Sequence, residues 1–191
     1  IAPTQICIVP IQQKKEGVLD KAYELRDQLR KSGFRVKVDD GDKSPGFKFA
    51  DCEVRGIPLR IEVGPKDIEA GHAVLVRRDT REKIQVSFEE LAEETGKLLE
   101  QIQQDMYDRA KTFLEEHTSS ATNMDELVDI VNTKRGFVKA MWCGCRECED
   151  KLKEMSGITS RCIPFEQETI SDTCVVCGKP ATKMVYWGRA Y

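Results

Sequence analysis

The stretch QICIVPIQQKKEGVLDKAYELRDQLRKSGFRVKVD, residues 5–39, decides the fold class. Its opening apolar run, QICIVPI, predicts a short buried strand. Apolar residues then recur at helical spacing and stop before Gly33, a residue favoured just after a helix: Leu19, Ala22, Leu25 and Leu29. The alternating FRVKVD predicts a second strand. Strand, helix and strand in this order predict a βαβ unit.

The next forty residues extend this α/β pattern. The segment GDKSPGFKFA, residues 41–50, is rich in turn formers and predicts a loop. PLRIEV, residues 58–63, alternates as a strand with one apolar face, and HAVLVRR, residues 72–78, is another apolar run. We therefore expect two further strands in the same sheet.

A long helix is predicted to link two domains. Ser87 and Glu90 have the spacing of a capping box, and an apolar stripe continues to about His117: Leu91, Leu98, Ile102, Met106 and Phe113. Asn123 and Glu126 form a second capping box before a cysteine-rich region. We expect an α/β domain over residues 1–104 and a small α+β domain over residues 105–191.

The composition limits the class of protein. A net charge of −3 argues against nucleic-acid binding through a broad basic surface, so any such contact must be local. No apolar run reaches the roughly eighteen residues of a membrane helix. The start IAPTQICIVPI lacks the features of an export signal, and it opens on a strand without a methionine. We expect a cytoplasmic fragment of a longer protein that does not bind membranes.

Eight cysteines in such a protein indicate metal binding rather than disulfides. The segment WCGCRECEDKLKE, residues 142–154, holds three of them, and CVVCGK, residues 174–179, holds two. Two cysteine pairs at this separation predict a structural four-thiolate zinc site. Spacing leaves open whether Cys143 or Cys145 pairs with Cys148, since both gaps are common. The remaining cysteines are predicted to be core thiols: Cys7, Cys52 and Cys162.

Two other uses of these cysteines fit the sequence less well. A zinc deaminase needs a histidine two residues before a glutamate, whereas His72 and His117 are followed by AV and TS. The WCGC segment resembles a thioredoxin motif, but only one residue separates its thiols and no βαβ unit surrounds it.

A second informative stretch is GFKFADCEVRGIPLRIEVGPKD, residues 46–67. In LRIEV the apolar side chains point one way, so Arg60 and Glu62 point the other way and leave one face for polar contacts. An aromatic platform flanked by both charges suits unpaired bases, because a ring stacks on a base and a carboxylate accepts from guanine. Its candidate members are Phe49, Glu53, Arg60, Lys66 and Asp67. The alternative is a solvated sheet edge with surface ion pairs.

The segment PGFKFADCEVRGIPLRIEVGPKDIEAGHAVLVRRD, residues 45–79, resembles the anticodon-binding domain of prolyl-tRNA synthetases, of the type shared by archaea, eukaryotes and some bacteria. The resemblance continues through WCGCRECEDKLKE, SRCIPFEQE, CVVCGKP and the terminal YWGRAY, and it covers essentially the whole chain. It implies a mixed-sheet α/β domain with flanking helices, followed by a small α+β zinc-binding domain.

The resemblance also implies site residues. The expected anticodon contacts are Phe49, Glu53, Arg60, Lys66, Asp67 and, more weakly, Arg78. The expected zinc ligands are Cys143, Cys148, Cys174 and Cys177, with Cys145 outside the metal site. Tyr191, at the end of the chain, is expected to reach the aminoacylation site. The sequence departs from the family at Cys52, where tryptophan is usual, and at the additional Cys145.

The implied function is recognition of the anticodon of proline tRNA, so that a class II catalytic domain attaches proline using ATP and magnesium. The signature motifs of that domain are absent from this sequence, so we expect the fragment itself to be inactive. The resemblance further implies a homodimer for the full-length enzyme. The alternatives are a zinc-stabilised protein-interaction module without base recognition and a thiol redox enzyme.

Overall fold

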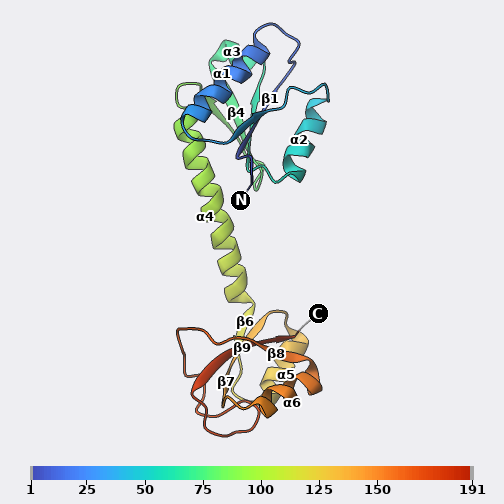
Figure 1. The fold of residues 1–191 in the computed structure, drawn as a ribbon, viewed down its shortest axis with the longest axis vertical. Helices are drawn as coiled ribbons and strands as arrows, with labels where there is room; N and C mark the ends of the chain where they lie inside the picture. The colour runs from blue at the N-terminus through green and yellow to red at the C-terminus, as the bar shows by residue number, and fades with distance from the viewer. Residues whose placement is uncertain (1, 190–191) are drawn as a thin grey trace. The chain divides into compact units, whose positions relative to one another are not determined.

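The computed structural model describes residues 2–189 and divides into two compact units, residues 1–107 and 108–191 (Figure 1). The first unit has a five-stranded sheet of strand order β2-β1-β3-β4-β5, and the second has a four-stranded sheet of order β6-β7-β9-β8. Both sheets mix parallel and antiparallel pairs and carry helices, which confirms the predicted fold class. Tyr191 lies outside the described residues.

The predicted βαβ unit is present. It consists of β1 (Ile6–Pro10), α1 (Val18–Lys31) and β2 (Val36–Val38), with the two strands parallel. The helix ends because Gly33 adopts a φ of 91°, and the Phe34 amide then donates to the Leu29 carbonyl at 3.2 Å. The apolar stripe of α1 packs on one face of the sheet and forms the main core of the unit.

The other strands of the first sheet are β3 (Leu59–Val63), β4 (His72–Arg77) and β5 (Lys83–Ser87). Strand β3 is parallel to β1, whereas β4 and β5 are antiparallel to their neighbours. β3 and β4 were expected, but β5 and the short helix α3 (Pro65–Ala70) were not. The strand order places β3 at the centre of the sheet, so elements that pack on either face of the sheet cover its side chains.

The prediction of a loop over residues 41–50 is wrong in its second half, because α2 (Pro45–Val54) begins there. Ser44 caps this helix by accepting from the Phe47 amide at 3.4 Å, and Pro45 occupies the first turn, where its missing N–H costs nothing. Helix α2 packs through Cys52 on Cys7 and Val9 of β1. Figure 1 shows α2 on one side of the sheet, with α1 and α3 on the other.

The long predicted helix is α4 (Leu91–Glu116). The expected Ser87 and Glu90 bond forms, since the Glu90 amide donates to Ser87 Oγ at 3.3 Å, but the helix itself begins one residue after Glu90. Gly96 does not break the helix, and its Cα faces the Phe34 ring. The first turns of α4 are buried through Leu91 and Thr95.

The second unit contains β6 (Thr118–Ser120), α5 (Met124–Thr133), β7 (Phe137–Trp142), α6 (Arg146–Ser156), β8 (Ile158–Cys162) and β9 (Lys183–Arg189). Asn123 caps α5 as predicted, accepting from the Glu126 amide at 3.0 Å. Both helices pack on one face of the sheet through Leu127 and Leu152, around the fully buried Trp187. A smaller core beside it holds Met141, Met184 and two cysteines.

Candidate nucleic-acid interface and metal centre

Four cysteines of the second unit come together. The sulfur atoms of Cys143, Cys148, Cys174 and Cys177 all lie within 4.8 Å of one another. The Cys143 sulfur is 3.7 Å from that of Cys148 and 3.8 Å from that of Cys177. Tetrahedral zinc with bonds of about 2.3 Å would hold sulfurs about 3.8 Å apart. This donor set and geometry can therefore hold one metal ion.

Local structure explains the arrangement of these thiols. Cys143 directly follows β7, and Cys148 lies in the first turns of α6. The other pair sits in a tight turn in which the Cys174 amide donates to the Lys179 carbonyl at 2.7 Å and Gly178 has a φ of 68°. Burial would raise the pKa of Cys174, but backbone N–H groups of Cys177 and Val176 outweigh it and lower this pKa to about 7. That thiol is thus prepared to bind as a thiolate.

Cys145 lies outside the cluster. It is exposed, and its thiol donates to Glu147 Oε2 at 2.7 Å. The Trp142 indole N–H donates to the Cys145 carbonyl at 3.1 Å and holds this turn in place. The spacing alternative that pairs Cys145 with Cys148 is therefore not the arrangement in the structure.

Three cysteines were expected in the core, and two of them are buried there. Cys7 and Cys52 face each other between β1 and α2, where the hydrogen bond with Cys52 and then burial raise the pKa of Cys7. Cys162 is exposed at the end of the edge strand β8, so that prediction is wrong. An edge strand has one unpaired side, and its last residue has no second layer to cover it.

The polar cluster on β3 is built around Arg60. Its guanidinium carbon lies 4.1 Å from the centroid of the Phe49 ring, in cation–π geometry. Its Nε and Nη2 donate to Glu62 Oε1 at 3.1 and 2.9 Å. The face of β3 that the sequence left free is in fact covered, since Arg60 is 8% and Glu62 9% exposed. Two of the nitrogen groups of Arg60 are thus committed to a buried ion pair.

Glu53 lies at the edge of this cluster, near the end of α2, and remains partly exposed. Its carboxylate is 3.9 Å from Arg60 Nη1 on one side and 3.9 Å from Arg81 Nη2 on the other. Arg78 is exposed, and its Nε donates to the Glu53 carbonyl at 2.9 Å. Phe49, Glu53, Arg60 and Arg78 therefore form one group, in which Glu53 offers acceptor oxygens to solvent. We call these four residues the Phe49 group.

Lys66 and Asp67 lie on α3, beyond the other end of β3. Asp67 Oδ2 accepts from the Gly64 amide at 2.8 Å and caps the helix, and Asp67 Oδ1 lies 3.3 Å from His72 Nε2. Lys66 is exposed. These contacts involve none of the Phe49 group. The sequence placed all five candidate residues in one platform, whereas the structure distributes them over both ends of β3.

Sequence reasoning missed three residues around this cluster. Glu62 was assigned to the same face as Arg60, but nothing in the sequence showed that the pair would be buried. Lys83 Nζ, 3.2 Å from Glu62 Oε2, belongs to the unpredicted strand β5. Arg81 and Lys83 both lie in the segment VRRDTREK, residues 76–83, whose density of basic residues was a usable signal.

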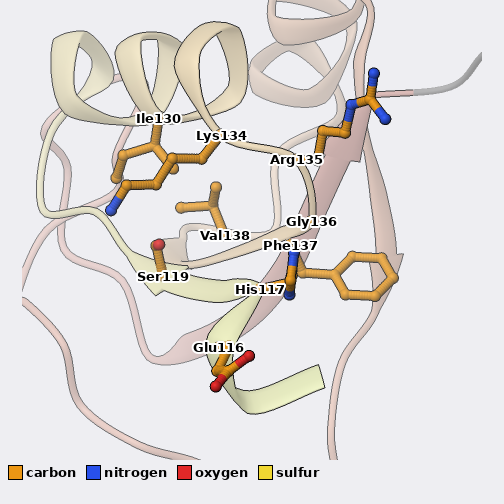
Figure 2. Close-up of a pocket in the computed structure, with 9 residues that line it drawn as sticks. All are labelled: Glu116, His117, Ser119, Ile130, Lys134, Arg135, Gly136, Phe137 and Val138. Carbon is orange, nitrogen blue, oxygen red and sulfur yellow. The ribbon is translucent and has the colours of Figure 1, made fainter. Parts of the chain in front are cut away.

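A pocket in the second unit lies where β6 meets β7 (Figure 2). Its lining residues include His117, Lys134 and Arg135, but Figure 2 shows Lys134 and Arg135 extending in different directions. The His117 Nδ1 is already 2.8 Å from the Phe113 carbonyl oxygen. The cationic groups do not converge, so this pocket is not a candidate anion site.

Within residues 2–189, no helix combines the length and the apolar character needed to cross a lipid bilayer.

Comparison with known proteins assigns both units. Residues 5–98 match the family model described as anticodon binding domain, and residues 124–191 match the one described as prolyl-tRNA synthetase, C-terminal. Proteins named proline–tRNA ligase are similar over all of this chain: 59% identity in Lachnospira eligens, 61% in Lachnoclostridium phytofermentans and 58% in Clostridium novyi. The chain spans 40% of the length of each. The chain therefore belongs to the prolyl-tRNA synthetase family, with an anticodon-binding domain and the family's C-terminal domain.

Proposed function

We propose that this chain recognises the anticodon of proline tRNA on behalf of a proline–tRNA ligase. The observation that carries the proposal is the identity of about 60% to proline–tRNA ligases across all 191 residues, including both domain matches. A net charge of −3 fits recognition by a local site better than binding by bulk charge.

The Phe49 group supplies suitable chemistry for the anticodon. Every proline anticodon ends in two guanines, because proline codons begin with two cytosines. Guanine presents two adjacent N–H donors on its Watson–Crick edge, and the partly exposed Glu53 carboxylate can accept both. The Phe49 ring contacts Arg60 and packs on the Cys7–Cys52 cluster, and because it is only partly buried we propose that its exposed part stacks on a base. We assign base recognition to Glu53 and stacking to Phe49.

The other expected contacts take different roles in this proposal. Arg60 holds the platform, since two of its nitrogens already donate to Glu62. Lys66 is exposed and suits a phosphate, whereas Asp67 keeps one oxygen near His72 that a second base can reach. Arg78 is exposed beside Glu53. These assignments extend the anticodon site over both ends of β3.

We further propose that the four-cysteine cluster binds structural zinc. Four thiolates leave no coordination position for water, so the metal would stabilise the second unit rather than catalyse a reaction. In this proposal residues 1–104 form the anticodon-binding domain and residues 105–191 the zinc-binding domain.

For the rest of the enzyme we propose the functions that membership of this family implies. The catalytic part would bind ATP and magnesium and attach proline in the cytoplasm, acting as a homodimer. Tyr191 would contact the aminoacylation site. These 191 residues alone would bind tRNA without charging it.

The deciding experiment is a binding titration with a proline anticodon stem-loop at one fixed salt concentration. Loops with adenine at either guanine serve as the comparison. Base recognition predicts at least about tenfold weaker binding for each swap. Glu53→Gln should then bind both loops almost equally, because an amide nitrogen replaces one acceptor oxygen. Binding without discrimination would favour a protein-interaction module instead.

A further inference from the structure

Residues 77–81, the last residue of β4 and most of the turn that leads to β5, carry three arginines in different surroundings, and we call this segment the arginine hairpin. Arg77 is buried and donates to Asp79 through Nε at 3.1 Å and Nη2 at 2.8 Å. Its Nη2 also donates to Asp105 of α4 at 2.5 Å. These bonds raise the pKa of Arg77 and lower the pKa values of Asp79 and Asp105. The hairpin is thereby fixed to α4.

Arg81 is held in an unusual backbone conformation by the same turn. Its φ is 63°, which a residue with a side chain adopts at a cost, and its amide donates to the Arg77 carbonyl at 3.0 Å. Its side chain is 81% exposed and lies 3.9 Å from the Glu53 carboxylate. An exposed pair at this distance adds little stability. The small contribution of the Arg81–Glu53 pair to folding stability therefore does not explain why the turn holds the Arg81 guanidinium in solvent.

The surroundings of Glu53 pose an electrostatic problem for RNA binding. A carboxylate that reads a base must approach a polyanion, and a cation of the protein close by reduces the repulsion. Arg60 cannot serve, because it is buried and bonded to Glu62. Within the described residues, Arg81 and Arg78 are the exposed cations that contact Glu53. A guanidinium also matches phosphate through two parallel N–H bonds.

We propose that the arginine hairpin is a phosphate-binding arm of the RNA site, with Arg81 as its main contact and Arg78 as its second. On binding, Arg81 leaves Glu53 for a backbone phosphate, and the Glu53 carboxylate turns to the base. The hairpin supplies affinity without sequence information, whereas Glu53 supplies discrimination. This inference rests on the proposed function, because it assumes that RNA occupies the Phe49 group.

The test is the salt dependence of stem-loop binding by Arg81→Gln. Loss of one phosphate contact to a single strand should lower the slope of log K against log salt by about 0.7. Affinity at low salt should fall about three- to tenfold, equally for the proline loop and the guanine-substituted loops. The double variant Arg78→Gln, Arg81→Gln should lower the slope by about 1.4.

The matched control is Arg146→Gln. Arg146 is also exposed, and its Nε lies 3.7 Å from Asp150, so the variant removes the same charge from a similar loose pair. It should leave the slope unchanged. The unfolding temperature of Arg81→Gln should equal that of the parent, which shows that folding is intact.

The outcomes separate this inference from the proposed function. If the chain discriminates guanines but Arg81→Gln and Arg146→Gln have equal slopes, the hairpin inference is wrong and the anticodon proposal stands. If binding lacks discrimination but the Arg81→Gln slope still falls, the hairpin binds phosphate and base recognition fails. No binding of any loop by the parent chain overturns both.

Discussion

At the scale of single residues, the buried Glu62 determines whether Arg60 keeps its place over Phe49. Glu62→Ala removes the acceptor of two Arg60 N–H groups and leaves a buried guanidinium without its close partner. Breaking one side of such a pair should lower the free energy of unfolding by about 3 kcal/mol. Denaturant unfolding of the chain measures this change, and stem-loop titration should show weaker base discrimination.

The control for that substitution is Glu82→Ala, since Glu82 is exposed in the turn directly before β5. It should alter the unfolding free energy by less than about 0.5 kcal/mol. A Glu62→Ala variant as stable as Glu82→Ala would mean that Arg60 finds another partner, and that Glu62 does not hold it.

A second prediction for individual residues compares two cysteines, Cys143 and Cys145, which are two positions apart in the sequence. Cys145→Ser should keep one metal ion per chain, because the Cys145 sulfur bonds to Glu147 outside the four-sulfur cluster. Cys143→Ser should weaken metal binding at least about tenfold, since three thiolates and a poor ligand remain. Competition with a coloured chelator measures both affinities. Equal losses in the two variants would show that Cys145 exchanges into the site.

Whether the sequence predicts the burial of these residues depends on which elements pack over them. The alternation of LRIEV placed Arg60 and Glu62 together on one face, but it left that face open to solvent. The structure buries both: Phe49 of α2, a helix that begins in a segment predicted as loop, lies against Arg60, and Lys83 of the unpredicted strand β5 lies beside Glu62. Cysteine spacing, by contrast, predicted two thiol pairs independently of the fold. It left Cys143 and Cys145 as alternatives, the family resemblance implied Cys143, and the structure places Cys143 in the four-sulfur cluster.

At the scale of elements, the contact between β6 and β7 depends on a glycine. A Cβ at Gly136 would lie 1.9 Å from the His117 carbonyl oxygen, which accepts from the Phe137 amide at 2.8 Å. Gly136→Ala must therefore push the two strands apart at this bond. We expect a loss of at least about 3 kcal/mol in unfolding free energy of the second unit. Denaturant unfolding followed by tryptophan fluorescence measures it.

Gly157→Ala separates backbone strain from this collision. Gly157 ends α6 with a φ of 64°, but the nearest atom to a Cβ added there is Arg189 Cγ at 4.0 Å. This variant should lower the unfolding free energy by only about 1 kcal/mol, which is the strain of a left-handed alanine. Similar losses for both variants would mean that the β6–β7 contact adapts without penalty.

Elements with strong periodicity were predictable, and those with mixed signals were not. The apolar stripe of α1 and the capping residue Asn123 of α5 identified their helices. The segment GDKSPGFKFA failed, because its glycines and proline dominate a count of turn formers. The order Ser44–Pro45 also marks a helix start, with a capping hydroxyl followed by proline in the first turn. The order of the residues in this segment therefore indicated a helix start, although their composition indicated a loop.

At the scale of the whole molecule, the two units have separate sheets and separate cores, and the four-cysteine cluster found among residues 2–189 lies in the second. The sequence predicted a metal-stabilised second domain from its ligand spacing, without predicting strands β7 to β9. The reason is that chelating side chains are recognisable individually, whereas short strands are specified by partners that lie far away in the chain.

This separation predicts that a strong chelator destabilises one unit and spares the other. A metal ion whose free concentration is a thousandfold above its dissociation constant adds about 4 kcal/mol to the free energy of unfolding. For a domain of this size, this corresponds to at least about 15 °C in the unfolding temperature. Both tryptophans of the chain, Trp142 and Trp187, lie in the second unit, with ring centroids 6.2 Å apart. Tryptophan fluorescence therefore reports on that unit alone.

Thermal unfolding with and without chelator, followed by fluorescence and by amide hydrogen exchange, measures the effect. We expect the fluorescence transition to move down, while amides of β1 and β3 keep their protection because their core contains none of the four cysteines. Returning zinc should restore the transition, and Cys174→Ser should reproduce the chelated state without responding to zinc. Loss of protection in β1 and β3 at the same chelator concentration would show that the first unit depends on the metal, and that the two cores do not unfold separately.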